Sequence, residues 1–86
     1  MKNSVKCRAS VNWFTAQMEL KLRENDYKGG WAKCEHHWLL DRLKQEVVEL
    51  EKALDQVDNQ NVINEAADVA NFALMIADLA GKQYGN

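Results

Sequence analysis

Acidic and amide side chains recur at regular intervals in an otherwise apolar stretch near the end of the chain. Between residues 66 and 80, twelve of fifteen residues are Ala, Val, Leu, Ile, Met or Phe. Glu65, Asp68 and Asn71 nevertheless follow one another every three residues, and Asp78 comes one heptad after Asn71. Residues three apart on a helix are neighbours, so the first three side chains form one slanted row. Because ionised carboxylates in an apolar setting are costly unless cations or strong donors meet them, the row predicts a cation site.

A second acidic pair, Glu46 and Glu49, has the same spacing and lies on the flank of a stripe of leucines. If the two helices pack antiparallel, this E-x-x-E faces the E-x-x-D of Glu65 and Asp68. Four converging carboxylates repel one another by about 1–4 kcal/mol per close pair at 4 Å, depending on screening. Hard divalent cations relieve this repulsion, and magnesium takes oxygen ligands, keeps several waters and shares its shell with substrate phosphates. Together the two pairs predict a magnesium site.

Each acidic pair also has an ordinary explanation. An E-x-x-E on a helix is usually a solvated face, and we expect Glu51 on the same helix to be exposed in this way. Glu65 near a helix start would interact favourably with the helix dipole. Asp68 and Asn71 lack such an explanation, because they lie deeper in an apolar helix.

The elements that must position these residues are helices, and we predict an all-α fold. The first helix is expected to begin at a cap, Ser10 or Asn12, and to run to about residue 25. The run NDYKGG then ends it, since each of the paired glycines costs about 1 kcal/mol in a helix relative to alanine. Its apolar residues form two stripes, one of Phe14, Met18 and Leu22 and one of Trp13, Ala16 and Leu20.

Two further helices carry the acidic pairs. The second is expected to cover roughly residues 35–56, and the third about residues 62–81, with Asn59 or Asn61 as its cap. Gly81 is a natural stop for the third helix. Three helices with apolar surface on several sides do not easily satisfy themselves alone, so we expect a partner copy of the chain. The apolar stripe of the second helix consists of Leu39, Leu40, Leu43, Val47, Leu50 and Leu54.

Composition excludes several classes of protein. Eighty-six residues form one domain, and 28% charged and 47% apolar residues are typical of a globular protein. A net charge of −2 gives no reason to expect nucleic acid or an anionic membrane as a partner. The most apolar run, VANFALMIA, is too short to span a bilayer. Cys7 and Cys34 form no C-x-x-C and no apolar signal segment follows Met1, so we expect a cytoplasmic protein with reduced thiols.

The acidic pairs and their surroundings also resemble a known family. E-x-x-E followed after fifteen residues by E-x-x-D, with the continuation EAADVANFALMIAD, is similar to the MazG-like all-α nucleoside triphosphate pyrophosphohydrolases. KGGW, residues 28–31, resembles a segment of a subgroup that acts on purine deoxynucleotides. The likeness covers Trp13 to Lys82. It implies an antiparallel bundle of about three helices completed by oligomerisation, as a homodimer or homotetramer, and makes residues 10–86 one MazG-like domain. Residues 1–9 are polar and unpatterned, so we expect them to form a flexible tail.

The resemblance also implies an enzyme. It would hydrolyse a (deoxy)nucleoside triphosphate, and we expect a dNTP, to the monophosphate and pyrophosphate, for disposal of aberrant nucleotides or control of nucleotide pools. Family members bind Mg²⁺, with Mn²⁺ able to substitute, through four acidic residues, here Glu46, Glu49, Glu65 and Asp68. Glu46 or Glu49 would take the proton from the attacking water.

Residues around the acidic pairs are candidates for substrate binding. The resemblance makes Asn71 a contact to sugar or phosphate. Trp31 and Trp38 could stack on a base, although large aromatic side chains mostly serve cores and interfaces. Lys28 could reach a phosphate because Gly29 and Gly30 let its loop close over a ligand, or it is simply an exposed loop lysine. We expect the remaining nearby cations to be solvated charges: Arg42, Lys33 and Lys52.

Three other interpretations compete with this one. Cys34, His36 and His37 suggest zinc, but ligands this close cannot easily all face one ion, and structural zinc normally has four ligands. A di-iron bundle would need Glu-x-x-His motifs, which the chain lacks. A non-catalytic helical dimerisation module would explain the apolar stripes, but it leaves Asp68 and Asn71 without a purpose.

Overall fold

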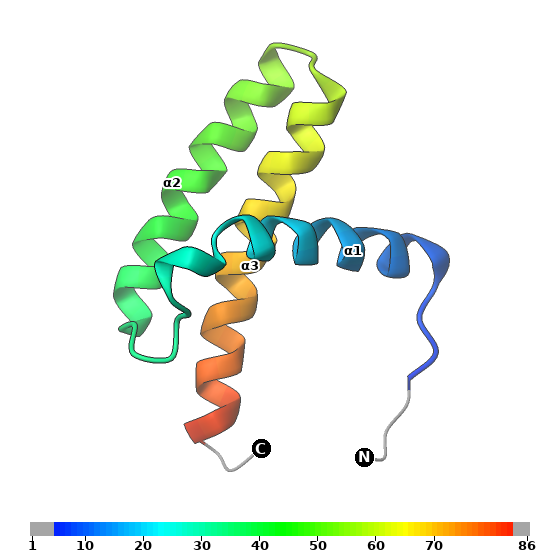
Figure 1. The fold of residues 1–86 in the computed structure, drawn as a ribbon. Coiled ribbons are helices and arrows are strands. Elements are labelled where there is room, and N and C mark those ends of the chain that lie inside the picture. Colours follow the sequence, from blue (N-terminus) through cyan, green and yellow to red (C-terminus); the bar gives the residue numbers. More distant parts are fainter. Residues whose placement is uncertain (1–4, 84–86) are drawn as a thin grey trace.

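The computed structural model describes residues 5–83 and contains three long helices joined by short connections (Figure 1). Helix α1 is Ala9–Glu24, α2 is His36–Asp55 and α3 is Asn59–Gln83, and a short 3-10 helix, η1, Asp26–Lys28, follows α1. Residues 5–83 contain no strand. The prediction of an all-α fold with three helices is confirmed.

Helix α1 begins slightly earlier than the sequence indicates. Arg8 is its extended N-cap residue, and the Arg8 carbonyl accepts hydrogen bonds at 3.1 Å from two backbone N–H groups of the first turn. The predicted caps, Ser10 and Asn12, are therefore wrong, because both residues already lie inside the helix and no side chain caps its start. The predicted end near residue 25 is confirmed, since Asn25 is the C-cap residue.

The expected division into a tail and a domain extends beyond the described residues. Positions 1–4 of the tail and 84–86 of the domain lie outside them. Residues 5–8 are exposed and non-helical, whereas residue 9 already belongs to α1. The division into a tail of residues 1–9 and a domain of residues 10–86 stays a prediction.

Helices α2 and α3 form an antiparallel hairpin (Figure 1). Glu35 caps α2, because its Oε1 accepts hydrogen bonds from the N–H groups of His37 (3.0 Å) and Trp38 (3.1 Å). Asp58 serves α3 in the same way, accepting from the N–H of Asn61 at 3.2 Å. A carboxylate at a helix start satisfies an otherwise unpaired donor and interacts favourably with the dipole.

The limits predicted for α3 are wrong at both ends. The cap is Asp58 rather than Asn59 or Asn61, so the helix starts one turn earlier than expected. Gly81 does not stop the helix, which continues to Gln83. A glycine costs about 1 kcal/mol inside a helix, and one such residue is tolerated near the end of a long helix.

Small side chains let α2 and α3 pack closely. Ala53 on α2 and Ala67 on α3 are 1% and 0% exposed, and Leu39 at the other end of α2 is 1% exposed. The distance between packed helices depends on the side chains at their contact, and small ones such as alanine allow a short distance. Since Ala67 immediately precedes Asp68, this packing holds the acidic face of α3 against α2.

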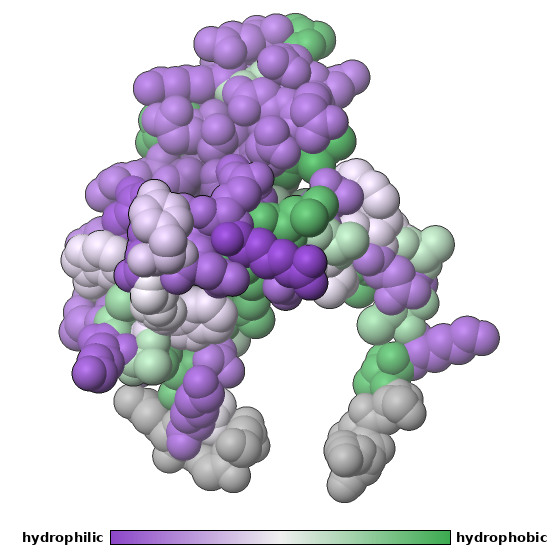
Figure 2. Space-filling model, viewed as in Figure 1, coloured by the Kyte–Doolittle hydropathy of each residue, from purple (hydrophilic) through white to green (hydrophobic). Residues whose placement is uncertain are grey.

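Helix α1 crosses the hairpin and packs on α3 (Figure 1). Of its two apolar stripes, the one containing Met18 is partly buried, whereas Trp13 and Leu20 of the other are about half exposed. The leucine stripe of α2 is also incompletely covered, with Val47 and Leu54 exposed. Figure 2 shows hydrophobic residues at the surface along α1 and polar residues over the α2–α3 turn. Completion of the core by another copy stays a prediction.

None of the helices in residues 5–83 has the length and apolar character needed to cross a bilayer.

Candidate active site

Three carboxylates from two helices meet where α2 and α3 pack. Glu46 comes from α2 and Glu65 and Asp68 from α3, and one carboxylate oxygen of each lies within 4.8 Å of the others. All three residues are partly buried, and the side chains of Glu46 and Asp68 are 14% and 23% exposed. The antiparallel packing lays the E-x-x-E side of α2 along the E-x-x-D row of α3. We call these three residues the acidic cluster.

Burial and mutual repulsion oppose ionisation within the acidic cluster. The pKa of Glu65 is raised first by burial and then by the charges of Asp68 and Glu46. The pKa of Asp68 is also raised, mainly by burial, because the ammonium group of Lys21 lowers it less than burial and the neighbouring carboxylates raise it. A divalent cation would relieve this penalty, since carboxylate oxygens are its preferred ligands.

Glu49, the fourth acidic residue from the sequence, lies outside the acidic cluster. Its side chain is 50% exposed, and its Oε2 lies 3.5 Å from Nζ of Lys52 on the same helix. Its charge nevertheless helps to raise the pKa of Glu65. Glu49 is therefore a neighbour of the cluster and not one of the three carboxylates that meet.

Two basic side chains contact the acidic cluster. Nζ of Lys21, from α1, lies 3.7 Å from Oδ1 of Asp68. Arg42 donates a hydrogen bond from Nη2 to Glu46 at 3.1 Å, and its guanidinium carbon is 5.1 Å from the centroid of the Phe72 ring. The expectation that Arg42 is a solvated charge is thus wrong, because the residue is only partly exposed and engaged on two sides.

Lys21 was not a candidate in the sequence. The sequence feature that could have identified Lys21 is its position three residues after Met18, at the edge of the α1 stripe that is partly buried. That signal is weak, since the exposed stripe of α1 looks equally apolar in the sequence.

A pocket of about 490 Å³ opens beside the acidic cluster. This volume is within the range of about 300–1,000 Å³ that small-molecule sites occupy. Its walls come from all three helices and from the loop between η1 and α2. Six candidates from the sequence line it: Lys28, Trp31, Trp38, Glu46, Asp68 and Asn71.

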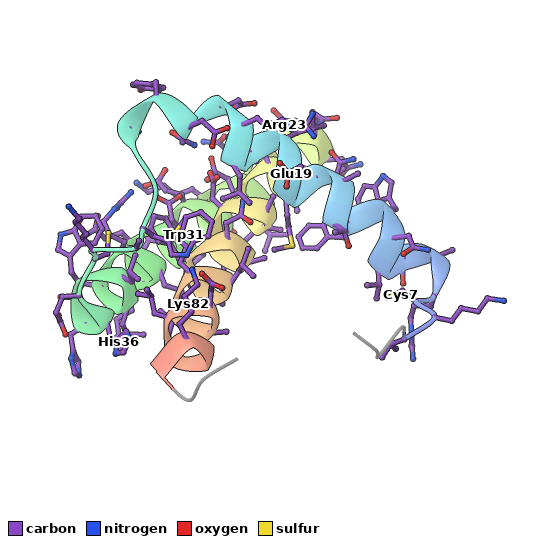
Figure 3. All side chains as sticks on the ribbon, turned by 60° about the horizontal axis from the view of Figure 1, so that its bottom comes forward. Cys7, Glu19, Arg23, Trp31, His36 and Lys82 are labelled. Carbon is purple, nitrogen blue, oxygen red and sulfur yellow. The ribbon has the colours of Figure 1, made fainter. Side chains whose placement is uncertain are left out.

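Asp78 fixes the loop that forms one wall of this pocket. The indole Nε1 of Trp31 donates a hydrogen bond to Oδ2 of Asp78 at 3.0 Å, and Nζ of Lys82 lies 2.9 Å from the same oxygen (Figure 3). Lys82 and then Trp31 hold the pKa of Asp78 below its usual value. Asp78 is thus separate from the acidic cluster and positions Trp31 over α3.

Replacing Asp78 by Ala is expected to loosen residues 25–35, because the Trp31 indole loses its acceptor. Hydrogen exchange measured by mass spectrometry should show faster exchange in this loop and unchanged exchange in the α2–α3 hairpin. Asp78→Asn keeps an acceptor oxygen and should have a smaller effect. Asp41→Ala, which removes an exposed carboxylate from α2, is the matched control. Equal exchange of the loop in wild type and Asp78→Ala would show that the hydrogen bond does not hold it.

Asn71 is 4% exposed and connects two helices. Its Nδ2 donates to the carbonyl oxygen of Met18 on α1 at 3.0 Å. Its Oδ1 is buried and has no hydrogen-bond partner among the described residues. Buried polar atoms are nearly always paired in proteins, so Oδ1 is an acceptor that a bound ligand or water can satisfy.

The CEHH run lies at the start of α2 and supplies its cap. Glu35 caps α2, and its Oε2 lies 3.3 Å from Nδ1 of the exposed His37. In the part of the chain that the structure describes, Cys34, His36 and His37 do not form a three-ligand group.

Residues 13–81, about four fifths of the chain, match the phosphoribosyl-ATP pyrophosphohydrolase family, PRA-PH. The chain belongs to this family. PRA-PH domains are part of the MazG-like all-α nucleoside triphosphate pyrophosphohydrolase superfamily, so the resemblance found in the sequence is confirmed. No curated protein and no solved structure matches the chain.

Membership of the PRA-PH family implies a pyrophosphohydrolase that acts on nucleotide-like substrates. The family is typically dependent on a divalent metal. The acidic cluster fits such an ion by its donor set, because it offers three carboxylate oxygens within 4.8 Å of one another. The cluster and the loop wall of the pocket both lie inside the matched segment.

Proposed function

We propose that this protein hydrolyses (deoxy)nucleoside triphosphates, with dNTPs preferred, to the monophosphate and pyrophosphate in a Mg²⁺-dependent reaction. The supporting observation is that two members of the acidic cluster lie on the wall of a nucleotide-sized pocket. Family membership supports the reaction class. The corresponding role is disposal of aberrant nucleotides or control of nucleotide pools in the cytoplasm.

Glu46, Glu65 and Asp68 would hold the ion, and Glu49 would complete the set of four when its half-exposed side chain turns toward them. A bound Mg²⁺ or Mn²⁺ neutralises phosphate oxygens and lowers the pKa of a bound water. Glu46 or Glu49 accepts the proton of the attacking water. Either residue fits this role, because Glu46 lies in the acidic cluster and Glu49 lies beside it.

The remaining pocket residues fit the other parts of a nucleotide. Trp38 is 53% exposed and lines the pocket, so its ring surface is available to stack on a base. Trp31 lines the same pocket and is held by Asp78. Lys28 is the last residue of η1, directly before Gly29 at φ 91°, and would contact phosphate. The free Oδ1 of Asn71 can only accept hydrogen bonds, so it fits a sugar hydroxyl and not an ionised phosphate oxygen.

The test is a substrate panel. Purified protein is incubated with each dNTP, each NTP and phosphoribosyl-ATP, with Mg²⁺ or with a chelator, and pyrophosphate and monophosphate are quantified. We expect Mg²⁺-dependent release of pyrophosphate, with dNTPs turned over most efficiently, and a folded Glu46→Gln variant as the inactive control. If the folded protein with Mg²⁺ turns over no nucleotide, the enzyme assignment fails and the non-catalytic dimerisation module becomes the better explanation.

A further inference from the structure

Lys21 differs from the other basic residue in the last turn of α1 because it faces the acidic cluster. Its side chain is 22% exposed, whereas Arg23 is 69% exposed and pairs with Glu19 on the same helix (Figure 3). Nζ of Lys21 lies 3.7 Å from Oδ1 of Asp68 and 3.3 Å from Oε1 of Glu24. Helix α1 thus supplies a cation to a site whose clustered carboxylates come from the other two helices.

A divalent ion and Lys21 compete for the same carboxylate. Carboxylate oxygens that hold Mg²⁺ cannot also keep an ammonium group at 3.7 Å without strong repulsion between the two positive charges. The cluster has three carboxylates, and Lys21 and Arg42 together supply two positive charges. These five groups carry a net charge of −1, and a divalent ion would change it to +1. We therefore expect Lys21 to leave Asp68 when the ion enters, and its flexible four-carbon stem allows this movement.

The pocket determines where the displaced ammonium group can bind. Lys21 itself lines this pocket, next to Asp68. In the proposed reaction, the acceptors that arrive with the ion are phosphate oxygens, because Mg²⁺ shares its shell with substrate phosphates. These oxygens would lie beside the cluster that Lys21 already contacts, so a short movement of the Lys21 side chain would replace Asp68 by phosphate as its negative partner.

We propose that Lys21 binds the polyphosphate chain of the substrate, after exchanging its ion pair with Asp68 for phosphate oxygens. This inference rests on the proposed function and adds a substrate-binding residue to it. Arg42 is less suited to such an exchange, because Glu46 and the Phe72 ring hold its guanidinium group from two sides. Lys28, the exposed last residue of η1, forms no ion pair among the described residues, and its Nζ lies 5.7 Å from the Tyr27 ring centroid.

The test measures two affinities of Lys21→Met by titration calorimetry. The affinity for Mg²⁺ alone should rise about threefold to fivefold, because a competing cation is removed. The affinity for inorganic pyrophosphate at saturating Mg²⁺ should fall about tenfold to a hundredfold, because a charged hydrogen bond is lost. Lys21→Gln provides a second neutral variant, and Arg23→Met, which removes an exposed charge from the same turn, should change neither affinity.

The opposite signs of the two changes distinguish phosphate binding from a structural ion pair. If both affinities fall, Lys21 only supports the site, and the inference is wrong. Unchanged pyrophosphate affinity in both neutral variants would also overturn it. If the wild-type protein hydrolyses nucleotides with Mg²⁺ but both Lys21 variants have wild-type affinities, the proposed function stands and only the role of Lys21 is wrong. If wild type binds no Mg²⁺, the proposed function fails and the inference with it.

Discussion

Replacing Asp68 by Asn is expected to lower kcat/KM by about 100- to 1,000-fold while the helices stay folded. Asp68 lies on the pocket wall, with a carboxylate oxygen within 4.8 Å of those of Glu46 and Glu65. The amide keeps the size of the side chain but removes a charge that the ion requires. Steady-state kinetics on the best substrate of the panel measure the loss, and circular dichroism verifies the helices.

The matched control is Glu51→Gln, because Glu51 is an exposed carboxylate on α2. Its kcat/KM should stay within about twofold of wild type, since substitutions of exposed residues outside the site usually have small effects. If Asp68→Asn is as active as this control, the acidic cluster is not the active site.

The same substitution should raise the stability of the metal-free protein at neutral pH. The pKa of Asp68 is raised in the folded state, so the folded chain binds this proton more tightly than the unfolded chain does. Ionisation of Asp68 therefore costs stability as pH rises from the unfolded pKa, near 3.8, through the raised folded value, and the cost persists above it. Asp68→Asn should melt above wild type at pH 7, with the difference shrinking toward about pH 4. A difference independent of pH would contradict this electrostatic cause.

The pairing of acidic faces could be predicted because it depends on spacing within each helix. Glu65 and Asp68 are three apart in an apolar helix, and this alone places them on one row. A hairpin with a short connection then makes the neighbouring helix antiparallel, so the side chain of Glu46 reaches that row. Glu49, on the same helix, belongs to the same pattern, but its side chain is turned toward Lys52. Periodicity does not determine the orientation of a single side chain.

The starts of α1 and α3 could not be predicted from residue preferences alone. The sequence around the start of α3 contains three good capping residues, Asp58, Asn59 and Asn61. Which one caps depends on where the backbone enters the helix, and Val57, with φ 55°, sets this by turning the chain just before Asp58. At α1 the carbonyl of Arg8 already accepts the first hydrogen bonds, so a cap further along has no function.

Contacts between elements were the least predictable part of the site. Lys21 meets Asp68, and Trp31 meets Asp78, only because α1 crosses α3 and the loop returns over it. Helix α1 has two apolar stripes, and the sequence does not say which one packs on its own chain. Lys21 lies at the edge of the stripe that packs on α3, and it is part of the site for that reason.

Magnesium is expected to raise the unfolding temperature of the wild-type protein substantially. An ion that binds only the folded state stabilises it by about 2.7 kcal/mol at a concentration one hundred times its Kd. For a domain of this size, that corresponds to a rise of roughly 10–20 °C. The physical source is the acidic cluster, in which burial and neighbouring charges raise the pKa of Glu65 and of Asp68. Thermal melts followed by circular dichroism across a MgCl₂ titration at constant ionic strength measure the effect.

The variants decide whether this stabilisation comes from a specific site. Asp68→Asn should lose most of the rise in unfolding temperature, while Glu51→Gln should keep it, because Asp68 belongs to the acidic cluster and Glu51 does not. An equal rise in both variants would mean that Mg²⁺ acts by general screening of an acidic surface. A helical dimerisation module without a metal site would show no rise at all, since a ligand that does not distinguish folded from unfolded chain leaves stability unchanged. The melting curves therefore separate a metal-binding active site from a purely structural bundle without any assumption about the substrate.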